Sequence, residues 1–86
     1  MGLDIVEFLM LAEKEFGITI TDAEAGEIYT VGQFSSLCHA KLQADPDNNI
    51  DEPQVFSVLV QILREKFSIK KSVKREDLIV NYLRMD

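Results

Sequence analysis

The 86-residue sequence predicts a small all-α protein, a single domain that folds as a four-helix bundle. Apolar residues recur at intervals of three and four along several segments, which is the spacing of one face of a helix. Two threonines are each followed three residues later by Glu or Gln, a pattern typical of helix starts. Hydrophobic residues make up 47% of the chain, enough to form one core at this length.

The first predicted helix spans residues 3–16. Its apolar side chains form a stripe that we expect to face the core, with a narrower stripe beside it: Ile5, Leu9, Ala12 and Phe16 in the first, Val6 and Met10 in the second. Asp4 stands near the start, where a carboxylate suits the positive end of the helix dipole. Gly17 is typical of a helix end.

Two shorter helices are predicted next. Thr21 and Glu24 have the capping-box spacing, and Ala25 and Ile28 should then face inward. Thr30 and Gln33 repeat that spacing before a helix with four apolar residues on one face: Val31, Phe34, Leu37 and Cys38. We expect Cys38 to be a core residue, because its neighbours do not form the electropositive setting of a reactive thiol.

Residues 42–54 are predicted to be a linker, because Pro, Asn and Asp favour turns. Asp51, with Pro53 just inside, should start the last long helix, over residues 55–67. Its expected core stripe is Phe56, Leu59, Leu63 and Phe67, flanked by Val55, Val58 and Ile62. A loop anchored by Ile69 and Val73 and a short apolar segment over 78–83 complete the chain.

Charge and composition exclude several classes of function. The net charge of −6 argues against a general nucleic-acid partner, including for the basic stretch from Lys70 to Arg75. Residues 1–54 hold eleven acidic and two basic residues, whereas residues 55–86 hold four and seven. We expect no membrane span, and the single cysteine suits a reducing cytoplasm. His39 lacks partners at metal-ligand spacing, so no metal is expected.

The first helix resembles the second helix of acyl carrier proteins. The matching residues are Leu3-Asp4-x-Val6-Glu7, then Met10, then Glu13-x-Glu15-Phe16-Gly17-Ile18. In that family this helix opens with Asp-Ser-Leu-Asp, and the serine hydroxyl is esterified to the phosphopantetheine arm. Gly2 stands at the serine position here and has no hydroxyl, so the chain is not expected to hold the cofactor.

The C-terminal part resembles the beginning of the same family. The matching residues are Glu65-Lys66-Phe67-Ser68-Ile69, then Val73, then Ile79-Val80, then Leu83-Arg84-Met85-Asp86. The order implies a circular permutation: residues 1–41 would be the family's helices two to four, 42–54 a linker, and 55–86 its first helix and following loop. Gly2 and Asp86 should then lie close together, with helix 55–67 antiparallel to helix 3–16. Two chains that exchange helices would satisfy the same resemblance, so a monomer and a helix-exchanged dimer both stay open.

The resemblance implies a non-enzymatic protein that presents an acidic helix to partner enzymes. Its docking face would be Asp4, Val6, Glu7, Met10 and Glu13, and Leu3, Asp4 and Asp86 would flank the Gly2 position. Partners would be synthases, acyl transferases or ligases of fatty-acid or polyketide type, with basic docking surfaces. The alternative is an arm-less interaction or regulatory module unrelated to acyl transfer. An enzyme is disfavoured, because no catalytic residues form a recognisable motif.

Overall fold

The computed structural model describes residues 3–47 and 49–83. Over these residues the protein is an all-α bundle, as the sequence predicts. It has four α-helices, α1 (Leu3–Phe16), α2 (Asp22–Ala25), α3 (Val31–Gln43) and α4 (Glu52–Lys66), followed by a short 3-10 helix, η1 (Ile79–Asn81). Within the described ranges the one extended pairing is an isolated antiparallel bridge between Thr30 and Leu78.

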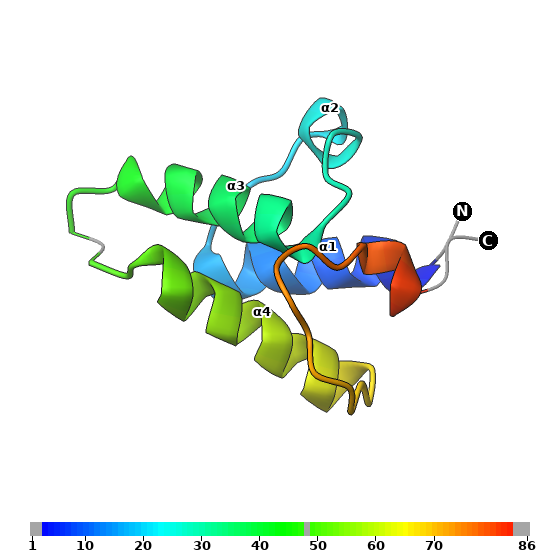
Figure 1. Cartoon of the computed structure of the whole chain (residues 1–86). Helices are drawn as coiled ribbons and strands as arrows, with labels where there is room; N and C mark the ends of the chain where they lie inside the picture. The colour runs from blue at the N-terminus through cyan, green and yellow to red at the C-terminus, as the bar shows by residue number, and fades with distance from the viewer. Residues whose placement is uncertain (1–2, 48, 84–86) are drawn as a thin grey trace.

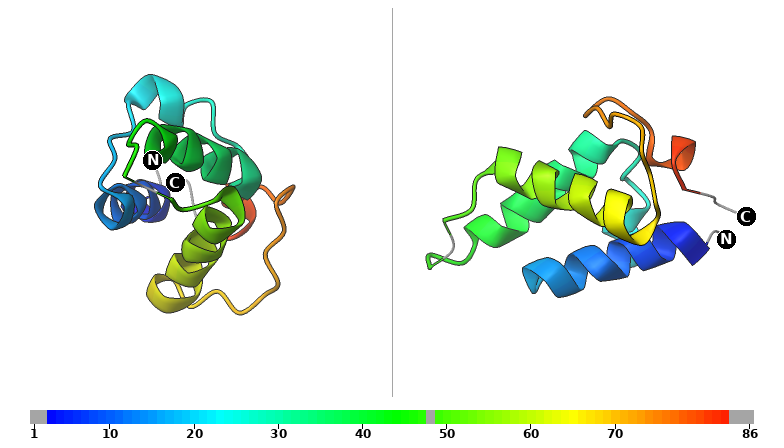
Figure 2. Two further views of the ribbon diagram at one scale, coloured as in Figure 1. Left: turned by 90° about the vertical axis from the view of Figure 1, so that its left-hand side faces the viewer. Right: turned by 90° about the horizontal axis from the view of Figure 1, so that it is seen from below.

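Three long helices form the body of the molecule. α3 and α4 are antiparallel neighbours, and α1 packs beside them, running opposite to α4 (Figures 1 and 2). The one-turn helix α2 projects to one side. We call residues 67–83 the C-terminal segment. It leaves the end of α4 and returns to the start of α3, so that η1 lies at the same end of the bundle as the first turns of α1 (Figure 1).

Local hydrogen bonds fix the starts of three helices. Both threonine capping boxes are formed: Thr21 exchanges hydrogen bonds with Glu24, and Thr30 with Gln33. Asp51, the predicted start of the last long helix, forms a third box with Gln54 at the start of α4. α1 ends at Gly17, whose φ of 65° lets the Ile18 N–H donate to the Glu13 carbonyl at 3.1 Å.

The core lies between α1, α3, α4 and η1. On α1 the predicted stripe is right for Ala12, which is fully buried, but it omits Phe8. Phe8 is fully buried; its ring makes edge-to-face contacts with Phe34 and Phe67, with centroid distances of 5.1 and 6.1 Å. Phe8 is not part of the predicted stripe, although positions 8 and 12 are neighbours on a helix surface. Phe16, by contrast, is only partly buried. The buried apolar residues are Phe8, Ala12, Val31, Phe34, Cys38, Leu42, Val55, Leu59, Ile62, Leu63, Ile79 and Leu83.

The predicted linker is shorter than residues 42–54. α3 continues to Gln43 and buries Leu42, and α4 begins at Glu52. The stripe of α4 is also rotated relative to expectation: Val55 and Ile62 are buried with Leu59 and Leu63, whereas Phe56 is partly buried. Phe56 packs instead against Arg75 from the C-terminal segment.

The length and polarity of the helices bear on the prediction about membrane spans. None of the helices in the described part of the chain is long and apolar enough to span a bilayer.

Candidate functional site

The side of α1 that faces away from the core contains a shallow hollow. Three of the five predicted docking residues, Val6, Glu7 and Met10, line it together with Leu11 and Lys14. The hollow has a volume of about 440 Å³, and Met10 is 60% exposed at its wall. We call these five residues the outer hollow. It offers a partner three apolar side chains together with one negative and one positive charge.

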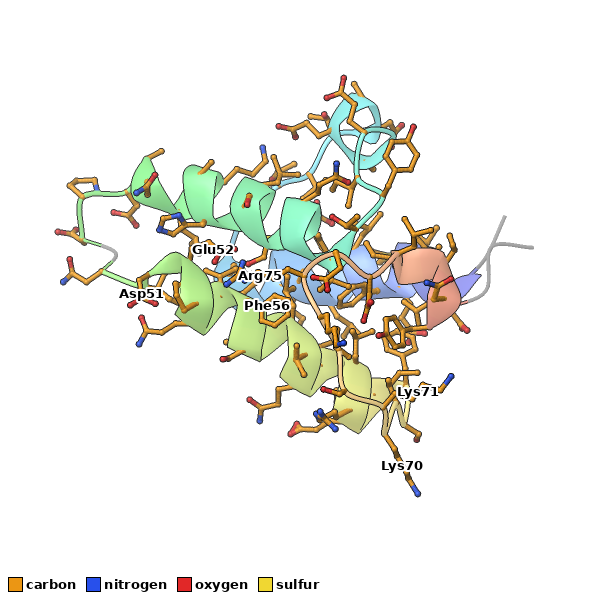
Figure 3. All side chains as sticks on the ribbon, viewed as in Figure 1. Asp51, Glu52, Phe56, Lys70, Lys71 and Arg75 are labelled. Atoms are coloured by element: carbon orange, nitrogen blue, oxygen red, sulfur yellow. The ribbon has the colours of Figure 1, made fainter. Side chains whose placement is uncertain are left out.

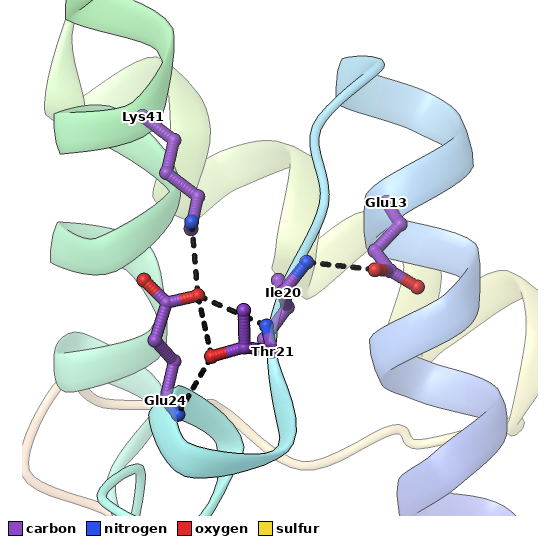
Figure 4. Close-up of polar contacts among 5 residues, drawn as sticks. All are labelled: Glu13, Ile20, Thr21, Glu24 and Lys41. Atoms are coloured by element: carbon purple, nitrogen blue, oxygen red, sulfur yellow. Dashed lines mark hydrogen bonds and ion pairs between the residues drawn. The ribbon is translucent and has the colours of Figure 1, made fainter.

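Glu13, the fifth predicted docking residue, has a structural contact instead. Its carboxylate Oε2 accepts a hydrogen bond of 2.7 Å from the Ile20 N–H and so holds the connection between α1 and α2 (Figure 4). The same connection is fixed on its other side by Thr21 and by an ion pair of 2.9 Å between Lys41 and Glu24. Hydrogen bonds from Thr21 and the charge of Lys41 lower the pKa of Glu24.

The residues predicted to surround the prosthetic-group position are described only in part. Gly2 and Asp86 lie outside the described residues, so their expected proximity stays a prediction. Leu3 begins α1, and Asp4 is half-buried in its first turn.

A second hollow lies next to the start of α1 and is almost entirely apolar. It has a volume of about 270 Å³ and is formed where α1, the α2 region and the C-terminal segment meet. Its walls are Ile5, Leu9, Ala25, Gly26, Ile28, Tyr29, Leu78, Ile79 and Val80. We call it the apolar cavity. Tyr29, Leu78 and Val80 are large apolar side chains that stay exposed around it. The cavity is not predictable from sequence spacing, because its walls come from three separate stretches of the chain.

A polar cluster fastens the C-terminal segment to α3 and α4 (Figure 3). The Glu52 carboxylate accepts a hydrogen bond of 2.6 Å from the hydroxyl of Ser35, which is fully buried, and pairs with Arg75 at 2.5 Å. The Arg75 guanidinium lies 4.6 Å from the centre of the Phe56 ring, a favourable cation–π geometry. These contacts, that of Arg75 first, lower the pKa of Glu52.

Backbone contacts continue this attachment towards η1. The N–H groups of Val31 and Gly32 donate to the carbonyls of Asp77 and Arg75 at 3.0 and 2.9 Å. The first turn of α3 is therefore satisfied by the chain itself and does not offer its N–H groups to a ligand. The Tyr82 hydroxyl donates to the Asp77 carboxylate, which raises the pKa of Tyr82 to about 12.

The described residues offer little for covalent chemistry. Cys38 is fully buried, and desolvation raises the pKa of its thiol to about 12, so the nucleophilic thiolate is scarce at neutral pH. Across residues 3–47 and 49–83, no three His, Cys, Asp or Glu side chains gather into a group suited to a metal ion. Lys70 and Lys71 point outward from the C-terminal segment (Figure 3).

Comparison with known proteins gives no assignment: no family model and no solved structure matches this chain.

Proposed function

We propose that the chain is an acyl-carrier-like, non-enzymatic protein without a phosphopantetheine arm, which docks on biosynthetic enzymes of fatty-acid or polyketide type through α1. The observation that most supports this proposal is the outer hollow. It joins Val6, Glu7 and Met10, three residues of the motif that resembles the carrier family, in one exposed surface. An acidic side chain beside exposed apolar groups suits a basic partner, because complementary charge steers association.

The order of the two resembling stretches adds support. η1 and the start of α1 contribute walls to the same cavity, so the two ends of the described chain are neighbours in the fold. A carrier domain cut at its prosthetic-group serine would have this property. α4 also runs opposite to α1, as the permuted order requires.

Restoring the missing hydroxyl tests the carrier resemblance directly. The variant Gly2→Ser would read Met-Ser-Leu-Asp, so a permissive phosphopantetheinyl transferase with coenzyme A should add the arm to it and leave the native chain unmodified. Intact-mass analysis followed by peptide mapping is the measurement. A Gly2→Ser chain that gains no mass contradicts the resemblance, and a native chain that gains it on any serine contradicts the arm-less proposal.

The docking surface needs a separate test. The reversal Glu7→Lys should weaken binding to a purified carrier-dependent synthase about tenfold at low salt, and less as salt rises. Glu15→Lys is the matched control, because Glu15 is an exposed acidic residue of the same helix outside the outer hollow. Equal binding by the native chain and Glu7→Lys, with thermal melts unchanged, excludes this surface.

Glu13 is unsuited to such a reversal, although the resemblance places it in the docking face. Its carboxylate accepts the Ile20 N–H, so Glu13→Lys should cost about 1–3 kcal/mol of stability by leaving that donor without its partner. Loss of binding in that variant would report a disturbed α1–α2 connection. Thermal melts distinguish the two effects, since Glu7→Lys should change stability by about 0.5 kcal/mol or less.

The second candidate is a regulatory module unrelated to acyl transfer. Gly2 favours it, because a glycine at the family's serine position removes the family's chemistry. Binding to a non-biosynthetic partner that Glu7→Lys abolishes, together with no affinity for carrier-dependent synthases, would select this function.

A further inference from the structure

We propose that the apolar cavity is a second docking site, which receives one apolar side chain from a partner segment rich in lysine or arginine. The surface lies on a different side of α1 from the outer hollow. It also includes parts of the α2 region and the C-terminal segment, and the proposal does not depend on the proposed function.

The cavity has the size and lining of an anchor pocket. Its volume of about 270 Å³ is below the range of roughly 300–1,000 Å³ that is usual for sites of drug-sized ligands. Ile5 and Leu9 form one wall, and Ala25 and Ile28 another. A pocket of this kind suits a single large side chain, and such buried apolar anchors dominate the energy of many protein interfaces.

The rim indicates that the occupant belongs to a larger partner. Tyr29, Leu78 and Val80 are 63%, 43% and 45% exposed, although each is a large apolar residue. All three line the cavity, and a partner backbone that crosses the opening would cover them. Exposed apolar patches rather than single residues mark interaction sites.

The acidic residues near the cavity indicate that the partner is basic. The charged residues that are next in sequence to a residue lining the cavity are all acidic: Asp4, Glu24, Glu27 and Asp77. Of these four, Glu24 pairs with Lys41, and the Asp77 carboxylate accepts hydrogen bonds from the Tyr82 hydroxyl and the Lys74 N–H. A carboxylate or phosphate headgroup would meet repulsion here, whereas lysines beside an apolar anchor would be attracted.

Short helical peptides of alanine and lysine, each with a single central leucine, phenylalanine or methionine, are suitable probes. Binding is followed by the amide chemical shifts of the isotopically labelled full chain. At least one peptide should bind and shift the amides of Ile28 and Val80, and it should lose affinity when the central residue is alanine or when glutamate replaces lysine. Decanol and decanoate are tested in parallel.

Three variants sharpen the test. Val80→Ser should weaken binding about threefold, and Ala25→Phe, which fills the cavity, about tenfold or more. Val80 is exposed, so Val80→Ser keeps the test valid even if Ala25→Phe does not fold. Met10→Ser is the matched control: it removes an exposed apolar side chain from the outer hollow and should leave peptide binding unchanged.

Several results would overturn the proposal. One is the absence of shifts at the cavity with every lysine peptide, and another is equal binding of the peptide with central alanine. Equal weakening by Met10→Ser and Val80→Ser would assign the peptide to the outer hollow instead. Binding of decanol or decanoate in the cavity without peptide binding would make it a site for small alkyl molecules.

Discussion

The helical bundle and the C-terminal segment are built in different ways. α2, α3 and α4 each begin with a capping box, in which residues three apart satisfy one another's N–H groups. The C-terminal segment contains one three-residue 3-10 helix and is held by contacts to distant parts of the chain, such as Arg75 to Glu52 and Asp77 to Val31. Local sequence therefore specifies the helices, whereas the folded helices specify the path of the segment.

Phe8 joins the two regions, so its removal should have the largest effect. The variant Phe8→Ala deletes a fully buried ring that touches Phe34 on α3 and Phe67 at the start of the C-terminal segment. We expect a loss of about 3–5 kcal/mol in the free energy of unfolding, measured by chemical denaturation. Phe16→Ala should cost less, because Phe16 is only partly buried. Equal losses would show that the core is not centred on Phe8.

Gly32→Ala should separate the two regions. An added Cβ at Gly32 would lie 2.9 Å from the backbone carbonyl oxygen of Arg75, so the C-terminal segment must shift. We expect a loss of about 1–3 kcal/mol and faster proteolysis within residues 68–78. Gly26→Ala is the control: its Cβ meets only ordinary contacts, and its φ of −67° suits alanine. Resistance of Gly32→Ala to proteolysis would mean that the segment is not docked against α3.

Acidification should loosen the segment by a smaller amount. The pKa of Glu52 in the folded state is lowered from its ordinary value of 4.5, chiefly by Arg75. The stability that this carboxylate contributes is therefore present above about pH 4.5 and is lost as the pH falls through the lower, folded-state pKa. Glu52→Gln should remove this part of the pH dependence, which denaturation between pH 3 and 7 would measure. Identical pH profiles for the native chain and Glu52→Gln would contradict it.

Sequence patterns predicted the helices well because helices depend on neighbours in the chain. The span of α1, the two threonine capping boxes and the stop at Gly17 all follow from residues within four positions of one another, whereas the end of α3 and the start of α4 lie inside the predicted linker. The rotation of each stripe was predicted less well. Periodicity cannot show that Arg75 will cover Phe56, or that Phe34 and Phe67 will converge on Phe8.

The candidate sites divide in the same way. Val6, Glu7 and Met10 share a surface because helical spacing alone brings them together. Glu13 was placed on the same face, but its carboxylate turns to Ile20, seven residues along the chain. The apolar cavity joins residues as distant as Ile5 and Val80, and only the path of the C-terminal segment brings them together.

The burial of Cys38 makes its labelling rate a measure of how often the core opens. It is the only cysteine in the chain, it belongs to α3, and it is fully buried in the core. An alkylating reagent can modify it only when the core opens, so the labelling rate counts those openings. Release of the C-terminal segment alone, as expected in Gly32→Ala, should leave the rate nearly unchanged, whereas Phe8→Ala should speed it greatly. The labelling rate of Cys38 thus distinguishes release of the C-terminal segment from opening of the core.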